Sequence, residues 1–188
     1  MLKLFSCDVS KMSDSEFLRM YQLCDKVRQN RIDRITKEPA KKLSAAAGML
    51  ARIAIGQCLK IDPLSITFRR NKNGKPYAEN LDIHFSLSHS GNLAVCAVSD
   101  QPVGIDVEKI RSVNYHLADK CFTLEERKYV FSERQKQQKR FFEIWTKKEA
   151  HVKRLGTGIT DFLSFDVRKD RKVYTLQKEQ YVISISTT

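Results

Sequence analysis

Glycine and proline are scarce in this chain of 188 residues, with 7 and 4 residues respectively, and no segment of low complexity occurs. This scarcity excludes a collagen-like or disordered chain, and the 41% of hydrophobic residues suffices for a core. No apolar run approaches the roughly 20 residues of a membrane-spanning helix. The first residues, Met1–Asp8, also lack the apolar run of a signal peptide. We expect one domain or two small fused lobes, without a membrane partner.

Cysteines are few and show no pattern. They are odd in number, far apart and without a Cys-x-x-Cys pair: Cys7, Cys24, Cys58, Cys96 and Cys121. Neither a disulfide framework nor a zinc cage is indicated. Reduced thiols in a cytoplasmic protein fit this usage best.

Acidic residues are outnumbered, since 34 Lys and Arg stand against 22 Asp and Glu and give a net charge of +12. Such a surface attracts polyanions, namely nucleic acid, an anionic membrane, a phosphorylated cofactor or an acidic protein. Charge alone does not choose among them, and a solvated basic surface without a specific partner is the alternative.

Hydrophobic periodicity predicts a mixture of strands and helices. Helices are expected over 14–30, 40–60 and 136–155, and at a capping box that begins at Thr123. Strands are expected over 2–9, 64–70, 84–88, 93–99, 103–108, 162–168, 172–177 and 181–186. Strands 93–99 and 181–186 close the two halves in similar ways. This predicts two α+β lobes, residues 1–102 and 103–188.

Two short segments hold the most informative acidic residues. Asp106 and Glu108 alternate with aliphatic residues in Val103–Glu108, so a strand would present both carboxylates on one face. Glu149 and Lys153 lie four residues apart on one side of a predicted helix. If strand and helix meet, three carboxylates converge beside a lysine, which suits Mg²⁺ and a phosphate. The alternatives are the polar face of an edge strand and a local helical ion pair.

The helix that carries Glu149 has a further charged residue, Lys148, inside its apolar stripe. A lysine there must find a partner or extend its ammonium group to the surface. The opposite side of the helix, predicted to face solvent, carries Lys147, His151 and Arg154.

Three other segments could bind phosphate. His89 follows a predicted strand at a glycine turn, where the hydroxyls and imidazole of Ser86–Gly91 can hold phosphate oxygens or simply cap the turn. Asn73–Pro76 is a turn that offers backbone amides and a lysine. Arg28 and Arg31 lie three apart on one helix face, as phosphate ligands or as a solvated basic face.

Together these segments resemble the 4'-phosphopantetheinyl transferase superfamily of the Sfp type. Its Gly-Ile-Asp-x-Glu pattern matches residues 104–108, and its Trp-x-x-Lys-Glu-x-x-x-Lys pattern matches 145–153, so that Glu149 follows Asp106 by 43 positions. Its Gly-Lys-Pro and Ser-His-Ser-Gly turns match 74–76 and 88–91. The resemblance runs from about residue 25 to 160. Ser86 stands where the family often has Asn, and the C-terminal lobe ends early for this type.

The resemblance implies an α+β fold of two similar lobes related by a pseudo-twofold axis, each a small, mainly antiparallel sheet packed with helices. The active site would lie in the cleft between them. The implied activity, that of a holo-[acyl-carrier-protein] synthase, transfers the 4'-phosphopantetheine arm of coenzyme A to a serine of an apo acyl or peptidyl carrier protein. Adenosine 3',5'-bisphosphate is released.

The resemblance also implies roles for individual residues. The Mg²⁺ ligands would be Asp106, Glu108 and Glu149, and the catalytic residues would be Glu149 as general base, Lys153 at the pyrophosphate, and His89. Ser88 and His89 would bind cofactor phosphates. The residues around the 3'-phosphate would be Arg28, Arg31 and Ser44, and those near the adenine would be Gly74, Lys75 and Pro76.

The implied partners are coenzyme A and an acidic carrier protein, with no nucleic acid, and two lobes in one chain imply a monomer. One alternative is another Mg²⁺-dependent phosphoryl or nucleotidyl transferase or hydrolase, which would share the carboxylates but not the two turns. A second is a non-enzymatic, basic nucleic-acid-binding module. It would interleave exposed aromatic and basic residues, whereas aromatics such as Phe141 and Trp145 fall on the helix stripe.

Overall fold

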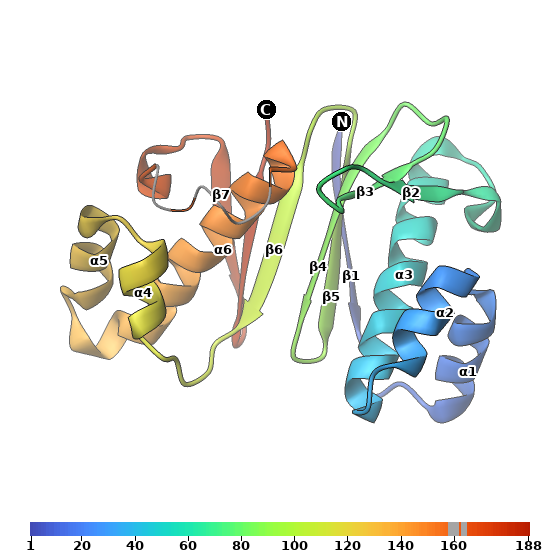
Figure 1. Cartoon of the computed structure of the whole chain (residues 1–188), viewed down its shortest axis with the longest axis horizontal. Helices are drawn as coiled ribbons and strands as arrows, with labels where there is room; N and C mark the ends of the chain where they lie inside the picture. The colour runs from blue at the N-terminus through green and yellow to red at the C-terminus, as the bar shows by residue number, and fades with distance from the viewer. Residues whose placement is uncertain (158–161, 163–164) are drawn as a thin grey trace.

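Two small sheets lie at the centre of the molecule and helices cover both flanks (Figure 1). The computed structural model describes residues 1–157, 162 and 165–188. One sheet has the order β1-β5-β4, formed by Leu2–Asp8, Leu93–Ser99 and His84–Ser90. The other has the order β6-β8-β7, formed by Gly104–Lys109, Tyr181–Ser186 and Val173–Lys178. All neighbouring strands are antiparallel, which confirms the predicted α+β class.

Helix α3 (Glu38–Leu59) covers the first sheet, and α1 (Asp14–Leu23) and α2 (Lys26–Asp33) pack on α3. The single helix predicted over 14–30 is wrong. The backbone is extended at Cys24, and the side chain of Asp25 then accepts a hydrogen bond from the backbone N–H of Arg28 and starts α2.

The segment after α3 is less extended than predicted. In place of one strand over 64–70, a 3₁₀ turn at Pro63–Ser65 precedes the short strand β2 (Phe68–Arg70). The turn forms because the side chain of Asp62 accepts a hydrogen bond from the backbone N–H of Leu64. A turn at Asn71–Lys75 joins β2 to β3 (Pro76–Ala78), as predicted.

Helix α6 (Gln137–Leu155) covers the second sheet, and α4 (His116–Cys121) and α5 (Leu124–Phe131) lie on the outer flank beside it. The predicted capping box at Thr123 is confirmed, and Gly156 ends α6 in the left-handed conformation with φ of 71°. The strand predicted over 162–168 is wrong where it is described, because Val167–Lys169 is a 3₁₀ turn. Positions 163 and 164 of that prediction lie outside the described residues.

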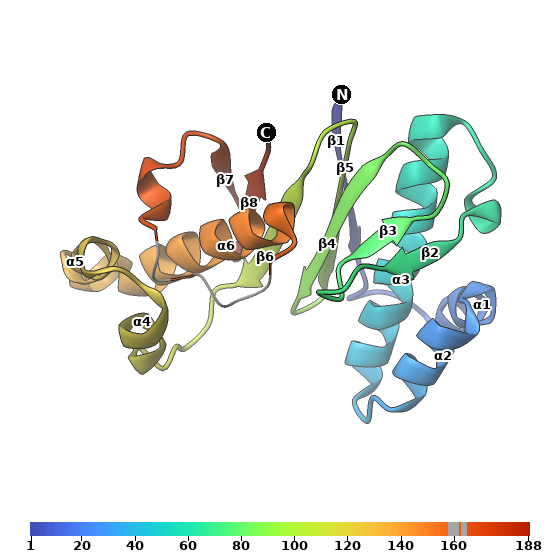
Figure 2. The same ribbon diagram turned by 45° about the horizontal axis from the view of Figure 1, so that its top comes forward.

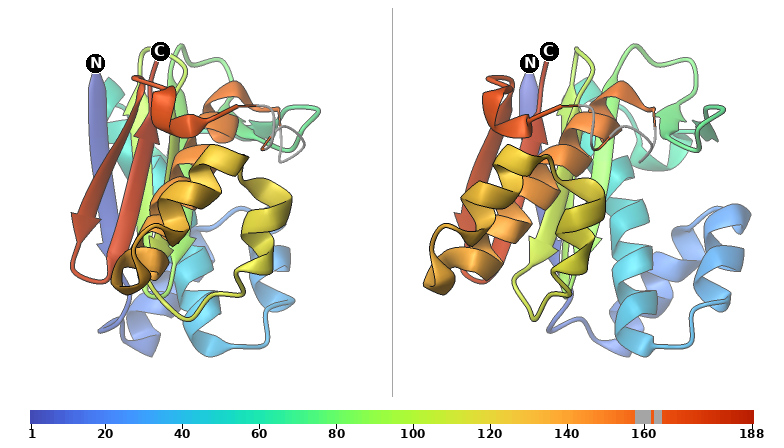
Figure 3. Two further views of the ribbon diagram at one scale, coloured as in Figure 1. Left: turned by 90° about the vertical axis from the view of Figure 1, so that its left-hand side faces the viewer. Right: turned by 60° about the vertical axis from the view of Figure 1, so that its left-hand side comes forward.

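Among the described residues, four apolar clusters hold these layers together, and the smallest lies between α1, α2 and α3. Another lies between α3 and the first sheet, and a third between α4, α5, α6 and the second sheet. The fourth joins the two halves, since alternate residues of β5 pack against alternate residues of β6 and β8. Figure 2 and Figure 3 show the resulting order of helices, two sheets and helices. Of the helices described, none is long and apolar enough to cross a membrane.

Candidate active site

Helix α6 lies directly on strand β6, so the two acidic segments meet as the sequence suggested. A Cβ atom at Gly104 would lie 1.9 Å from the backbone oxygen of Ala150 and 2.5 Å from the backbone nitrogen of Arg154. Only glycine permits this close approach of strand and helix. It brings Lys153 of α6 to Asp106 of β6, with 2.6 Å between Nζ and Oδ1.

Asp106 is the centre of this junction. Its Oδ1 accepts hydrogen bonds from Lys153 Nζ and from Ser88 Oγ, each at 2.6 Å, while its buried Oδ2 has no hydrogen-bond partner among the described residues. Burial raises the pKa of this carboxyl group above its usual range, although Lys153 acts in the opposite direction. A buried carboxylate oxygen without a partner is costly and suits a ligand that is added later.

The other two predicted acids lie near this centre with different surroundings. Glu108 accepts hydrogen bonds from Ser90 Oγ at 2.6 Å and from Arg111 Nη1 at 2.7 Å. Glu149 is half-buried, and its pKa is raised by burial and then by the negative charge of Asp106. Within the part of the chain that the structure describes, no three His, Cys, Asp or Glu side chains are gathered as a ready-made metal cluster.

Strand β4 joins the two halves through serine side chains, a feature that sequence reasoning missed. Ser86 Oγ accepts a hydrogen bond from the backbone N–H of Ile105, and Ser90 Oγ accepts one from that of Lys109, both at 3.1 Å. Ser88, between them, donates to Asp106. The alternating Ser-x-Ser-x-Ser pattern was the available signal, because alternate residues of a strand share a face.

This alternation separates Ser88 from His89. Ser88 is buried and engaged with Asp106, so its hydroxyl is not open to a phosphate in the described arrangement. His89 lies on the opposite side of β4, with its side chain accessible to solvent. Partial burial and then the positive charges of Arg31 and Lys153 lower the pKa of His89, which favours the neutral imidazole at neutral pH.

A pocket of about 610 Å³ lies between α2, α3, β2 and β4. Apolar side chains, among them Ile66, Phe68 and Phe85, form part of its wall. Five arginines line it, namely the predicted Arg28 and Arg31 together with Arg52, Arg69 and Arg70, which the sequence did not single out. Ser44 is buried in α3, and it is not among the residues that line the pocket.

Basic side chains lie both in this pocket, where Arg28 and Arg31 line the wall, and beside Asp106, where Lys153 contacts the carboxylate. Burial, followed by the charge of Arg31, lowers the pKa of Arg28, and His89 responds to both Arg31 and Lys153. We call Arg28, Arg31, His89 and Lys153 the basic track. Its members come from the pocket in the first half, from β4 and from α6 beside the acids.

The Gly-Lys-Pro turn docks on the end of α6. Gly74 has a left-handed backbone with φ of 82°. Lys75 Nζ donates to the backbone oxygens of Val103 and Arg154, both at 3.3 Å, and burial followed by the charge of Arg154 lowers its pKa to about 8. A second pocket of about 250 Å³ is lined by this turn, Glu149 and Lys153, and Pro76 borders both pockets.

Of the two arrangements expected for Lys148 the structure shows the one with a partner, whereas the expectation that His151 faces solvent is wrong. Lys148 does not reach the surface: it is fully buried and pairs with the equally buried Glu126 at 3.0 Å. His151 does not face solvent either, because its Nδ1 lies 2.7 Å from Oδ2 of Asp170. The segment 165–170 returns over this side of the helix, and Phe165 stacks on His151. The hydrophobic periodicity of α6 carries no information about a later segment that packs on its polar side.

Comparison with known proteins agrees with this architecture. A family model described as 4'-phosphopantetheinyl transferase superfamily matches residues 102–186, and one described as 4'-phosphopantetheinyl transferase, N-terminal, matches residues 11–101. The fold and the acids at its centre define an α+β protein of that superfamily, to which this chain belongs.

Individual relatives place the chain with the Sfp-like type. It is 36% identical to the 4'-phosphopantetheinyl transferase gsp of Aneurinibacillus migulanus, over 82% of this chain and 59% of the relative. It is 34% identical to the 4'-phosphopantetheinyl transferase Sfp of Bacillus subtilis, over 64% and 55%. With AcpT of Salmonella typhimurium the identity is 31%, over 71% of each chain. The alignments thus span little more than half of the first two relatives.

Proposed function

We propose that this chain transfers the 4'-phosphopantetheine arm of coenzyme A to a serine hydroxyl of an apo acyl or peptidyl carrier protein and releases adenosine 3',5'-bisphosphate. The basic track is the observation that carries this proposal. Coenzyme A carries a 3'-phosphate on its nucleoside and a pyrophosphate that leads to the phosphopantetheine arm, so its binding site needs cations at both groups. The arginine pocket and Lys153 provide them in this order.

The acids fit a bound Mg²⁺ ion. Their donors are all oxygens, and Asp106 keeps a buried Oδ2 free for a cation. Asp106, Glu108 and Glu149 would hold the ion, with Glu108 exchanging its contact to Arg111 for it. Bound Mg²⁺ would neutralise charge on the pyrophosphate oxygens.

The chain's own residues supply the other steps. Glu149, whose pKa is raised by burial, is suited to take the proton of the carrier's serine, because a base works best when its pKa is closer to neutral pH. Lys153 would stabilise the negative charge that grows on the leaving phosphate. Arg28 and Arg31 would bind the 3'-phosphate, and Pro76, between the two pockets, would contact the adenine.

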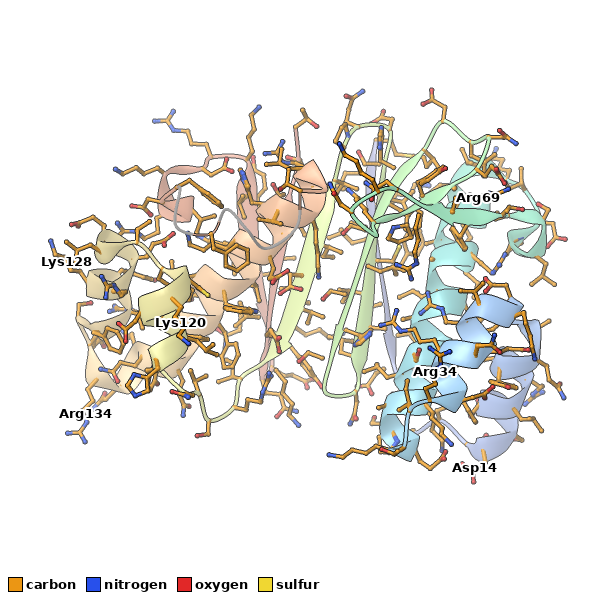
Figure 4. All side chains as sticks on the ribbon, in the orientation of Figure 1. Asp14, Arg34, Arg69, Lys120, Lys128 and Arg134 are labelled. Carbon is orange, nitrogen blue, oxygen red and sulfur yellow. The ribbon has the colours of Figure 1, made fainter. Side chains whose placement is uncertain are left out.

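The two halves would act together within one chain. We assign residues 1–102 to the lobe that binds the nucleotide and 103–188 to the lobe that holds the acids, with a monomer as the working unit. Basic side chains such as Arg34, Arg69, Lys120, Lys128 and Arg134 project from both flanks (Figure 4) and would attract an acidic carrier. All five cysteines are free thiols, which fits a cytoplasmic location.

The test is mass spectrometry of a panel of apo carriers incubated with the protein, coenzyme A and Mg²⁺. We expect one carrier serine to gain the mass of the phosphopantetheinyl arm, and a carrier with that serine replaced by alanine to gain nothing. Adenosine 3',5'-bisphosphate should appear only when apo carrier is present. Its release without carrier would favour a hydrolase instead.

The nucleic-acid-binding alternative has less support. Phe141 is buried and Trp145 stacks on it, so these aromatics are not available to bases. A salt-dependent gel shift with DNA or RNA, indifferent to Mg²⁺ and coenzyme A, would favour this alternative over the transferase.

A further inference from the structure

Gly48 stands where a helix would ordinarily prefer alanine. It lies inside the 22-residue helix α3, immediately after Ala45, Ala46 and Ala47. Its φ is not in the left-handed region, so the backbone does not require glycine. Glycine in a helix interior is destabilising relative to alanine. The reason for it must therefore lie in what approaches the helix at this point.

The neighbour is the side chain of Arg28. A Cβ atom at position 48 would lie 3.1 Å from Arg28 Nε, 3.5 Å from Cζ and 3.6 Å from Cδ. The guanidinium group thus lies against the bare helix backbone and borders the 610 Å³ pocket. Any side chain at position 48 would push it away by a few tenths of an ångström.

Arg28 is otherwise poised to bind an anion. Among the described residues, its guanidinium group makes no hydrogen bond or ion pair, although it is half-buried. Its backbone is fixed, because Asp25 Oδ1 accepts the hydrogen bond of the Arg28 N–H while Asp25 Oδ2 lies 3.3 Å from Nη2 of Arg52. Position 48 therefore controls the part of Arg28 that remains free to move.

We infer that Gly48 is a positioning residue that sets the guanidinium group of Arg28 for the phosphate on the nucleoside end of the substrate. It thereby favours ligands that carry this phosphate over ligands that lack it. Naming that ligand as coenzyme A rests on the proposed function. Gly104 offers a useful contrast, because a side chain there would strike backbone atoms and disrupt packing rather than move one side chain.

The direct test is calorimetric binding of adenosine 3',5'-bisphosphate and of adenosine 5'-monophosphate to the full chain. Arg28→Ala should weaken binding of the bisphosphate roughly 10- to 100-fold, because a charged hydrogen bond is lost. Gly48→Ala only displaces the same group, so it should weaken this binding by less, roughly fivefold. Binding of the monophosphate should not change. In the Arg28→Ala background, Gly48→Ala should add nothing, because both act through one group.

Gln57→Ala, on an exposed position of the same helix, is the matched control and should bind like the wild type. The thermal midpoint of Gly48→Ala should not fall, since alanine favours the helix. In the transfer assay, its KM for coenzyme A should rise at constant kcat, while the KM for 3'-dephospho-coenzyme A stays the same.

Equal loss of affinity for both nucleotides, or a full Gly48→Ala effect without Arg28, would overturn the inference. So would wild-type affinity of Gly48→Ala for the bisphosphate, while carrier modification would continue and the proposed function would stand. A wild type that neither binds the bisphosphate nor modifies carriers would overturn both.

Discussion

Replacing Asp106 by asparagine should remove activity without removing stability. Asp106 is 5% exposed, its Oδ2 has no hydrogen-bond partner among the described residues, and burial raises its pKa. A carboxyl group with a raised pKa in the folded state opposes folding once it is ionised. This cost is absent below the pKa of the unfolded chain, and it grows as pH rises from that pKa to the raised pKa of the folded state.

The magnitude follows from these surroundings. Each unit by which the pKa of Asp106 is raised costs about 1.4 kcal/mol of folding free energy once the carboxyl group is ionised. Asp106→Asn removes this cost but also removes the charge opposite Lys153, whose side chain is 30% exposed, for a loss of under about 1 kcal/mol. We expect the metal-free variant to be as stable as the wild type or up to about 1 kcal/mol more stable.

The assay is urea unfolding at pH 7.5, first with a chelator and then with Mg²⁺ at about ten times its dissociation constant, where the wild type should gain about 1.4 kcal/mol. Asp106→Asn should gain nearly nothing and should lose at least about 100-fold in turnover. Asp166→Asn is the control of opposite sign. Hydrogen bonds from Arg168 lower the pKa of Asp166, so its stabilisation is present at neutral pH and is lost as pH falls through that pKa.

A loss of more than about 2 kcal/mol in metal-free Asp106→Asn would refute this reasoning. Such a loss would mean that the Asp106–Lys153 ion pair stabilises the fold and that Asp106 is not free to bind a cation. An unchanged response to Mg²⁺ would refute the assignment of the metal site itself.

Four further outcomes are expected. Glu149→Gln should lower turnover at least about 100-fold with unchanged circular dichroism, and near-normal turnover would reject this residue as the base. Lys153→Ala should lower kcat more than it raises the KM for coenzyme A in steady-state kinetics, whereas a change in KM alone would indicate a binding role. Lys148→Met should cost about 3–5 kcal/mol in urea unfolding, because it leaves Glu126 buried and charged, and a variant of wild-type stability would show that Glu126 takes up a proton instead. Stability of the wild type should rise with pH from about 8 towards the unfolded pKa of Lys75, because only the unfolded chain still holds that proton, and Lys75→Met should lack this contribution.

Local patterns account for much of what the sequence predicted. The capping box at Thr123, the end of α6 at Gly156 and the hairpin of β4 and β5 depend on neighbouring residues, so they could be read directly. The break between α1 and α2 was missed because it depends on only two extended residues, Cys24 and Asp25. Hydrophobic periodicity over a few helical turns does not reveal a local change of the backbone ψ angle.

The candidate site was only partly readable for the same physical reason. Alternation placed Asp106 and Glu108 on one face of a strand, and helical spacing placed Glu149 beside Lys153. Spacing along the chain carries no information about which other elements face these residues. The resemblance to the family supplied the expectation that the two acidic segments meet. In the structure, the contact between α6 and β6 at Gly104 brings Lys153 to Asp106.

The sequence by itself determined the α+β class and most element boundaries, and it singled out the candidate acids and bases, because these follow from local periodicity and side-chain chemistry. Only the tertiary structure decided that Ser88 is engaged by Asp106, that Lys148 is buried against Glu126, and that five arginines share one pocket. Each of these depends on packing between residues far apart in the chain, where burial and the nearest charge decide what a polar group can do.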